Sequence, residues 1–172
     1  DGALNWFLGT RVGTAATFTV PRTTTVLGHY TTAGFYPAVA APVGDALGAG
    51  VVQAIGGAAR GVNASVYTRY PFVLSAADRA ATVSLTLRVR ADDGYAAFLN
   101  GTRVAGRNVP FPLTGTSAAT GETADGVALA GETVDLTGFL PLLRDGANVL
   151  SVQGLNAAAG DDDALVAVEL LS

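Results

Sequence analysis

Two clusters of aspartates are the residues whose type and spacing come nearest to chemistry. Asp92 and Asp93 stand in "ADDG" between two short apolar runs, and Asp161, Asp162 and Asp163 stand in "GDDDAL". Carboxylates that gather in a loop offer the oxygen ligands that calcium prefers. The alternative is structural, because Asp side chains in turns accept hydrogen bonds from backbone N–H groups. The candidate ligands of a structural calcium are Asp92, Asp93, Asp161 and Asp162, and no other cofactor is expected.

Catalytic constellations are not recognisable in the sequence. The chain has no cysteine and a single histidine, His29, so thiolate nucleophiles and histidine metal clusters are excluded. A G-x-S-x-G elbow does not occur. Glycoside hydrolysis needs two carboxylates that face each other across a cleft, and no pattern singles out such a pair. The sequence therefore predicts a protein that is not an enzyme.

Aromatic side chains are the groups that could bind a ligand without catalysis. Carbohydrate binding needs aromatic platforms with polar neighbours. The candidates are Trp6, in "ALNWFLG", Tyr30, Phe35, Tyr36, Tyr67 and Tyr70, of which Trp6 and Tyr36 are the first to test. Tyr70 and Phe72 fall on one face of an expected strand, where packing in a core is favoured.

The elements that must position these residues are short strands. In "SLTLRVR", apolar and polar residues alternate with the period of two that a half-buried strand requires. Similar runs are "TAATFTV", "TTTVLGHYTT", "VYTRYPFVL", "YAAFLNG", "NVLSVQGL" and "ALVAVELL". The one helical candidate is "LTGFLPLLRDG", where Pro141 limits the helix to one or two turns. We therefore predict an all-β fold, an antiparallel β-sandwich of jelly-roll type.

Asparagines mark turns and sequons. Asn100-Gly101 is the strongest hairpin signal, because both residues tolerate positive φ, so "ADDG" and "LNG" are expected to bracket one strand of a hairpin. Asn63 in "NAS" and Asn100 in "NGT" are also acceptor sequons for N-glycans. Residues 34–61 and 110–132 have the composition of long loops.

Composition limits the partners. The 172 residues are enough for one domain, 1–172, and the net charge is −4 with ten scattered arginines and no lysine, so nucleic acid is not expected as a partner. No apolar run approaches the roughly 18 residues of a membrane helix. Charged residues are only 14% of the chain, against about 25% in ordinary soluble domains. Either small polar residues cover the surface, or part of it is buried against other subunits.

Several runs together carry a resemblance to a known group of domains. These are "GVNASVYTRYPFVL", "VSLTLRVRADDGYAAFLNGTRVAGRNVP", "TSAAT" and "VDLTGFLPLLRDGANVLSVQGLN". In order and spacing they resemble the jelly-roll module of large secreted bacterial proteins, which occurs beside spore-coat-kinase-like and lamin-tail domains and is similar to galactose-binding-like carbohydrate modules. The resemblance covers roughly residues 60–172. It implies a sandwich fold and an extracellular or cell-surface location, and a chain without methionine is consistent with a processed terminus or with an artificial boundary.

Apolar segments lead to the functional expectation. A strand over "ALVAVELL" would be apolar on both faces, with Val166 and Val168 on one of them, and residues 1–20, with Phe18 and Val20, could pair with a sheet edge of a neighbouring copy. The sequence thus predicts a secreted structural subunit that assembles with copies of itself into a filament or surface layer. The alternative is a lectin-like module that binds cell-surface or environmental polysaccharides.

Overall fold

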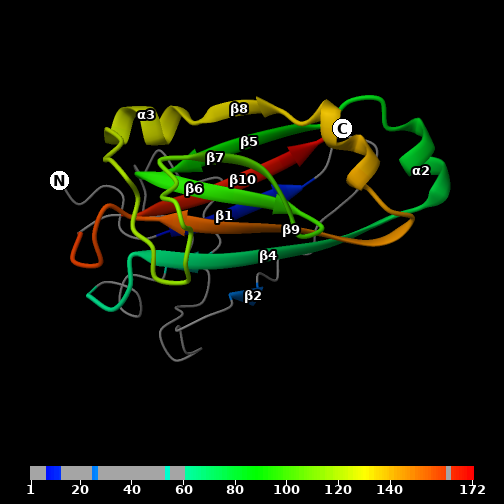
Figure 1. The fold of residues 1–172 in the computed structure, drawn as a ribbon. Helices are drawn as coiled ribbons and strands as arrows, with labels where there is room; N and C mark the ends of the chain where they lie inside the picture. Colours follow the sequence, from blue (N-terminus) through cyan, green and yellow to red (C-terminus); the bar gives the residue numbers. More distant parts are fainter. Residues whose placement is uncertain (1–6, 13–24, 27–52, 55–60, 162–163) are drawn as a thin grey trace.

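Two β-sheets pack face to face in this protein (Figure 1). The computed structural model describes residues 7–12, 25–26, 53–54, 61–161 and 164–172. Sheet A has the strand order β3-β1-β10-β5-β8, and sheet B has the order β2-β4-β9-β6-β7. The strands are β1 (Phe7–Val12), β2 (Thr25–Val26), β3 (Gln53–Ala54), β4 (Ser65–Leu74), β5 (Thr86–Ala91), β6 (Gly94–Leu99), β7 (Thr102–Arg107), β8 (Glu132–Asp135), β9 (Gly146–Leu155) and β10 (Leu165–Leu171).

Antiparallel pairing dominates both sheets. The longest pair joins β4 and β9 over ten residues each, from Ser65 opposite Leu155 to Leu74 opposite Gly146. The exception is β1, which runs parallel to β10 in the same chain. The predicted antiparallel β-sandwich is therefore confirmed, with one parallel pair that the sequence did not indicate.

The core lies between the sheets and follows the alternation of the strands. On β4, Tyr70, Phe72 and Leu74 are buried while Arg69 and Val73 are exposed, as a period of two requires. Tyr70 and Phe72 thus occupy the core positions predicted for them. The largest fully buried side chains are Tyr70, Tyr95, Leu74, Leu85, Leu87, Leu99, Leu136 and Leu150.

Helices are short and lie at the margins of the sandwich (Figure 1). The expected turn around Pro141 is a 3₁₀ helix, η2 (Thr137–Leu142). Two helices were not anticipated, α2 (Ala76–Ala81) and α3 (Asp125–Ala130). The sequence does contain a capping residue for α2, Ser75, directly before the helix. Its hydroxyl accepts a hydrogen bond from Asp78 N at 3.1 Å. No helix in the described ranges has the length and apolarity of a membrane span.

The hairpin of β6 and β7 forms as the sequence predicts. Asn100 and Gly101 connect the two strands with φ values of 50° and 88°. Two consecutive residues with positive φ are the signature of a type I′ turn, whose twist matches that of the flanking strands.

Strand β10 occupies the middle of sheet A, and this position accounts for its apolar sequence. Val166 and Val168 face the core and are only 4% and 2% exposed. Ala167, Glu169 and Leu171, on the other face, are half-buried. The apolar character of Val166 and Val168 therefore needs no partner molecule. Phe18 and Val20 lie outside the described residues, and exchange of residues 1–20 between copies stays a prediction.

An ion pair connects the edges of the two sheets. Arg107, on β7 of sheet B, places Nη1 3.0 Å from Oε1 of Glu132, on β8 of sheet A, and donates a further hydrogen bond to the carbonyl of Ala91. Its guanidinium carbon lies 6.0 Å from the centroid of the Tyr95 ring. Burial, together with the nearby Glu132 carboxylate, raises the pKa of Tyr95 well above its ordinary value.

One close contact between the two sheets requires a glycine. Gly154 follows Leu150 and Val152 on the inner face of β9, and a Cβ atom at this position would lie 2.2 Å from Cγ2 of Val166 on β10. The Val166 side chain fills the space that the missing Cβ leaves open.

Gly154→Ala is therefore expected to lower the free energy of unfolding by about 2–3 kcal/mol, because the added methyl group overpacks the core. Urea unfolding followed by circular dichroism measures the change. The control is Gly126→Ala in α3, where a Cβ meets nothing within 4 Å and alanine improves helix propensity by about 0.5–1 kcal/mol. Equal stability of the two variants would contradict this account of the sheet packing.

Candidate functional site

The outer face of sheet B carries a row of side chains that could contact a ligand. Alternation points Tyr67 and Arg69 of β4 outward, opposite Gln153 and Ser151 of β9. Phe98 of β6 lies opposite Ser151 on the other side. Arg69, Ser151 and Phe98 thus form one line across three neighbouring strands.

Two open hollows adjoin along this face and share Arg69. The larger has a volume of about 610 Å³ and lies at the end where β9 begins; the smaller, about 240 Å³, lies over the middle of the strands. We call the two hollows together the outer groove. Its lining residues are Tyr67, Thr68, Arg69, Pro71, Phe98, Asn100, Gly101, Arg144, Ala147, Asn148, Val149, Ser151, Val152 and Gln153.

The floor of the outer groove is mainly apolar, with polar groups above it. Tyr67, Phe98 and Val149 are half-buried, so each leaves part of an apolar surface open to solvent. Ser151 lies between Phe98 and Arg69 in the same row. An apolar floor with a few polar groups is the usual composition of a small-molecule or oligosaccharide site.

A loop closes one end of the smaller hollow. The Tyr67 hydroxyl donates to the carbonyl of Thr114 at 3.4 Å, and Nε2 of Gln153 donates to the same carbonyl at 2.8 Å. Gln153 Nε2 also donates to Oγ of Ser65 at 3.0 Å. Burial raises the pKa of Tyr67, with the hydrogen bonds to Ser65 and Gln153 acting in the opposite direction. The Tyr67 hydroxyl and the Gln153 amide thus meet at one carbonyl of the loop.

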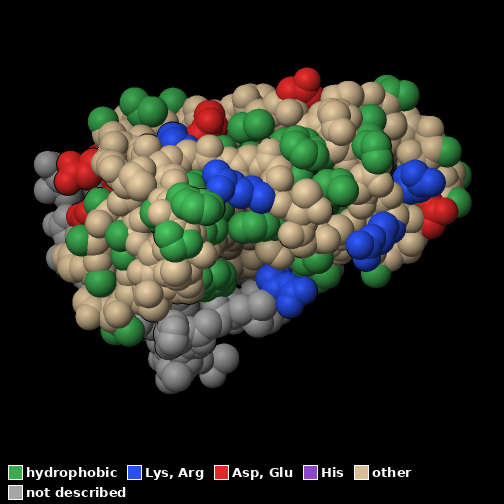
Figure 2. All heavy atoms as spheres, in the orientation of Figure 1, with side chains coloured by type: hydrophobic (Ala, Val, Ile, Leu, Met, Phe, Trp, Pro, Cys, Tyr) green, Lys and Arg blue, Asp and Glu red, His purple; other side chains and the backbone are tan. Residues whose placement is uncertain are grey.

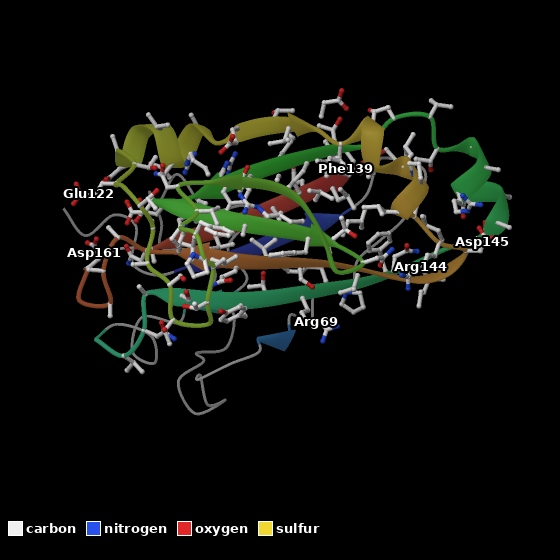
Figure 3. The ribbon with its side chains drawn as sticks, viewed as in Figure 1. Arg69, Glu122, Phe139, Arg144, Asp145 and Asp161 are labelled. Atoms are coloured by element: carbon white, nitrogen blue, oxygen red, sulfur yellow. The ribbon has the colours of Figure 1, made fainter. Side chains whose placement is uncertain are left out.

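An asparagine pair builds the opposite end of the groove. Nδ2 of Asn100 donates to Oδ1 of Asn148 and to the carbonyl of Leu142, both at 2.8 Å, while its Oδ1 accepts from Val149 N at 2.9 Å. Asn148 is only 3% exposed and bonds back to Arg144 N and O. The β6–β7 turn is thereby joined to the segment that carries Arg144, which Figure 3 shows just before β9.

Asp93 has a structural role. Its Oδ1 accepts from Thr123 N at 2.9 Å and its Oδ2 from Ala157 N at 2.6 Å. Its backbone carbonyl accepts from Nδ2 of Asn108 at 2.8 Å and from the Thr123 hydroxyl at 2.9 Å. Asp93 adopts φ 56°, which turns the chain from β5 into β6. The alternative of a turn aspartate that accepts backbone N–H groups is confirmed for this residue.

Asp92 and Asp161, the other described aspartates proposed as calcium ligands, form no metal-binding group with Asp93. Asp92 is 4% exposed and its backbone N–H donates to Leu165 O at 2.9 Å. Asp161 belongs to the loop before β10 and is half-buried, and Asp162 lies outside the described residues. Among the residues that the structure describes, no group of three or more His, Cys, Asp or Glu side chains could hold a metal ion.

Both sequon asparagines use their amides inside the fold. Asn63 is 5% exposed; its Oδ1 accepts from Ser65 N at 3.1 Å and its Nδ2 donates to Gly115 O at 3.4 Å. Asn100 uses both amide hydrogens in the bonds given above. An N-glycan replaces one hydrogen of Nδ2, so at Asn100 one of the two donated bonds would be lost, and at Asn63 the glycan would have to leave a residue that is 5% exposed.

The sequence located only part of this site. Trp6 and Tyr36, the first aromatic candidates, lie outside the described residues, whereas Tyr67 lines the outer groove. Arg69 and Phe98 were not singled out. The alternation along "VYTRYPFVL" could have indicated them, since Tyr67 and Arg69 occupy the positions that alternate with the core residues Tyr70 and Phe72 and so face solvent.

Comparison with known proteins finds distant likeness in structure alone. No protein-family model matches the chain, and no curated protein is similar to it in sequence. It is similar to β-D-mannosidase from Dictyoglomus thermophilum at 15% identity over 53% of this chain and 9% of that one, with a TM-score of 0.34. It is also similar to a PA14 sugar-binding domain from an RTX adhesin at 18% identity over 86% of this chain and 69% of that one, with a TM-score of 0.33. No sequence family therefore supports the resemblance to jelly-roll modules of secreted bacterial proteins, and similarity this distant carries no functional argument.

Asp93→Asn is expected to lower the free energy of unfolding by about 2–3 kcal/mol, because an amide oxygen can accept only one of the two N–H groups and the NH₂ group then faces the other. Thermal unfolding measures the loss. Asp145→Asn is the control, since its ion pair with Arg79 is exposed and worth less than about 1 kcal/mol. Addition of a chelator should leave the melting temperature of the unsubstituted protein unchanged. A fall on chelation would show that calcium, and not only backbone N–H groups, holds the aspartates.

Asn100→Ala is expected to lower the free energy of unfolding by about 2–4 kcal/mol, because it leaves Val149 N and Leu142 O without their partner and forces alanine into positive φ. Asn100→Gly separates the two causes, since glycine tolerates the turn but lacks the amide. In chemical denaturation we expect the unsubstituted protein to be the most stable, Asn100→Gly to be less stable, and Asn100→Ala to be the least stable. If Asn100→Gly were as stable as the unsubstituted protein, the hydrogen bonds of the Asn100 amide would not contribute to stability.

Proposed function

We propose that this protein is a carbohydrate-binding module without catalytic activity, and that the outer groove holds part of a polysaccharide. The observation that supports the proposal is the groove itself: an open trough on a rigid sheet, with an aromatic and aliphatic floor beside guanidinium, hydroxyl and amide groups.

The chemistry of sugars matches this arrangement. A sugar ring has apolar C–H faces and a rim of hydroxyl groups, so it needs a flat apolar surface and planar donors at the same place. Tyr67 and Phe98 supply the surface, while Arg69 and Ser151 supply hydrogen-bonding groups in the same row. Because both hollows are open to solvent, a long chain can lie along them without its ends being buried.

The same lining supports binding without catalysis. The described residues of the outer groove include no aspartate, glutamate or histidine. General acid–base catalysis of glycoside hydrolysis needs two carboxylates beside the scissile bond. The proposed role is therefore retention of a polysaccharide, at the cell surface or in the surroundings of the cell.

Self-assembly into an extracellular filament or surface layer remains a second prediction. Its described candidates, Val166 and Val168, contact the core. Its other support is the low share of charged residues, 14%, and the apolar residues 1–20, of which the structure describes Phe7–Val12. No contact among the described residues favours assembly over carbohydrate binding.

Tyr67→Ala and Phe98→Ala are each expected to weaken binding of a polysaccharide by about 10- to 100-fold, because each removes apolar contact area worth about 1.5–3 kcal/mol. A glycan array identifies the ligand, and calorimetry with that ligand measures the affinity. Tyr67→Phe should retain most of the affinity, since the ring remains.

The matched control is Phe111→Ala, which removes a fully exposed aromatic that does not line the groove. Loss of binding with Phe111→Ala, and not with the groove variants, would place the ligand elsewhere. Absence of binding to any polysaccharide would refute the proposed function.

A further inference from the structure

The outer groove and its border carry positively charged side chains that form no ion pair with any described carboxylate. Arg69 and Arg144 line the groove, and Arg103 stands opposite Phe98 on β7. Within the part of the chain that the structure describes, none of these three arginines forms an ion pair, and all three are exposed. Figure 2 shows arginine side chains across this face and acidic side chains at its margins.

The outer face of sheet A is different. There Arg88 on β5 lies 3.3 Å from Glu169 on β10. Arg107, at the edge between the sheets, pairs with Glu132, and Arg79 beyond the groove pairs with Asp145. The protein as a whole carries a net charge of −4. Three unpaired arginines therefore lie on the outer face of sheet B, whereas the described residues of the outer face of sheet A include one, Arg90.

The arginines of the outer groove indicate which chemical group a ligand would place beside them. Its planar guanidinium matches a carboxylate through two parallel N–H···O bonds, and such charge-assisted bonds are about twice as strong as neutral ones. Arg69 stands in line with Ser151 and Phe98, so a carboxylate at Arg69 would belong to a ligand whose body lies on the apolar floor. Arg144, at the far end of the larger hollow, is placed for a second carboxylate on the same ligand (Figure 3).

We infer that the outer groove binds an acidic polysaccharide, a chain of uronic acid residues whose carboxylates pair with Arg69 and Arg144 while the sugar faces contact Tyr67 and Phe98. This inference rests on the proposed carbohydrate-binding function and adds the chemical class of the ligand.

A polyuronate fits the charge better than a denser polyanion does. Duplex DNA carries a phosphate charge about every 1.7 Å and needs a basic cluster to offset it. The outer groove offers single arginines separated by apolar and neutral polar residues, on a protein with net negative charge. A chain with one carboxylate per sugar and a C–H face on each ring matches that spacing of charge.

The test compares acidic polysaccharides with their neutral esters. Polygalacturonate and alginate are each immobilised beside their fully methyl-esterified forms, together with neutral glucan and mannan, and binding of the protein is measured by surface plasmon resonance. We expect binding to at least one acid form, loss of at least tenfold in affinity on its esterification, and weaker binding as salt is added.

Arginine variants test the contacts directly. Arg69→Gln and Arg144→Gln should each weaken binding to the acid form about tenfold, as expected for loss of one charge-assisted pair. Arg90→Gln is the matched control: it makes the same change of charge at an exposed position of β5, on the outer face of sheet A. Its affinity should equal that of the unsubstituted protein.

Three outcomes would overturn the inference. If esters or neutral glycans bind as well as the acids, and Tyr67→Ala but not Arg69→Gln weakens the binding, the ligand is a neutral sugar and the proposed function stands alone. If dextran sulfate binds as tightly as the polyuronates and Arg90→Gln weakens both equally, the attraction is unspecific. If none of the polysaccharides binds, the proposed function fails and the inference fails with it.

Discussion

The carboxylate of Asp93 is the interaction on which one whole end of the sandwich depends. Asp93 lies in the turn between β5 and β6, where its backbone adopts positive φ. Its carboxylate accepts from the backbone N–H groups of Thr123 and Ala157, which belong to two separate loops. With the side chain of Asn108 bonded to its backbone carbonyl, the segment between β7 and α3 is fixed against the sheets. Because Thr114 belongs to that segment and accepts from Tyr67 and Gln153, the orientation of the groove floor depends on the same aspartate.

The two faces of β4 show how a single strand serves both stability and recognition. Tyr70, Phe72 and Leu74 fill the core, and the alternate positions hold Tyr67, Arg69 and Pro71 toward solvent. The backbone of β4 is paired along its whole length with β9, so the outward side chains rest on a support that does not need to reorganise when a ligand binds. Preorganisation of this kind lowers the entropic cost of association.

Polar groups at the two ends of sheet B complete the groove by different means. At one end, the Asp93 carboxylate accepts from backbone N–H groups, and the Thr114 carbonyl of the loop accepts from Gln153. At the other end, Asn100 and Asn148 bond to each other and to nearby backbone groups. Both ends use buried or half-buried side chains whose partners are internal. Arg69, Arg103 and Arg144, by contrast, form no ion pair among the described residues, so their charge is available to a ligand.

The sequence by itself determined the class of fold, the hairpin turn and the core. Alternation in "VYTRYPFVL" and "SLTLRVR", together with Asn100-Gly101, depends on contacts within a few residues, and such patterns are legible along the chain. The sequence did not reveal the line of Tyr67, Arg69, Ser151 and Phe98, because strands far apart in the chain bring these residues together through their register. It also left the function of the aspartates open: a carboxylate in a turn can bind calcium or backbone N–H groups equally well. Only the tertiary structure shows that Thr123 N and Ala157 N donate to the two oxygens of the Asp93 carboxylate.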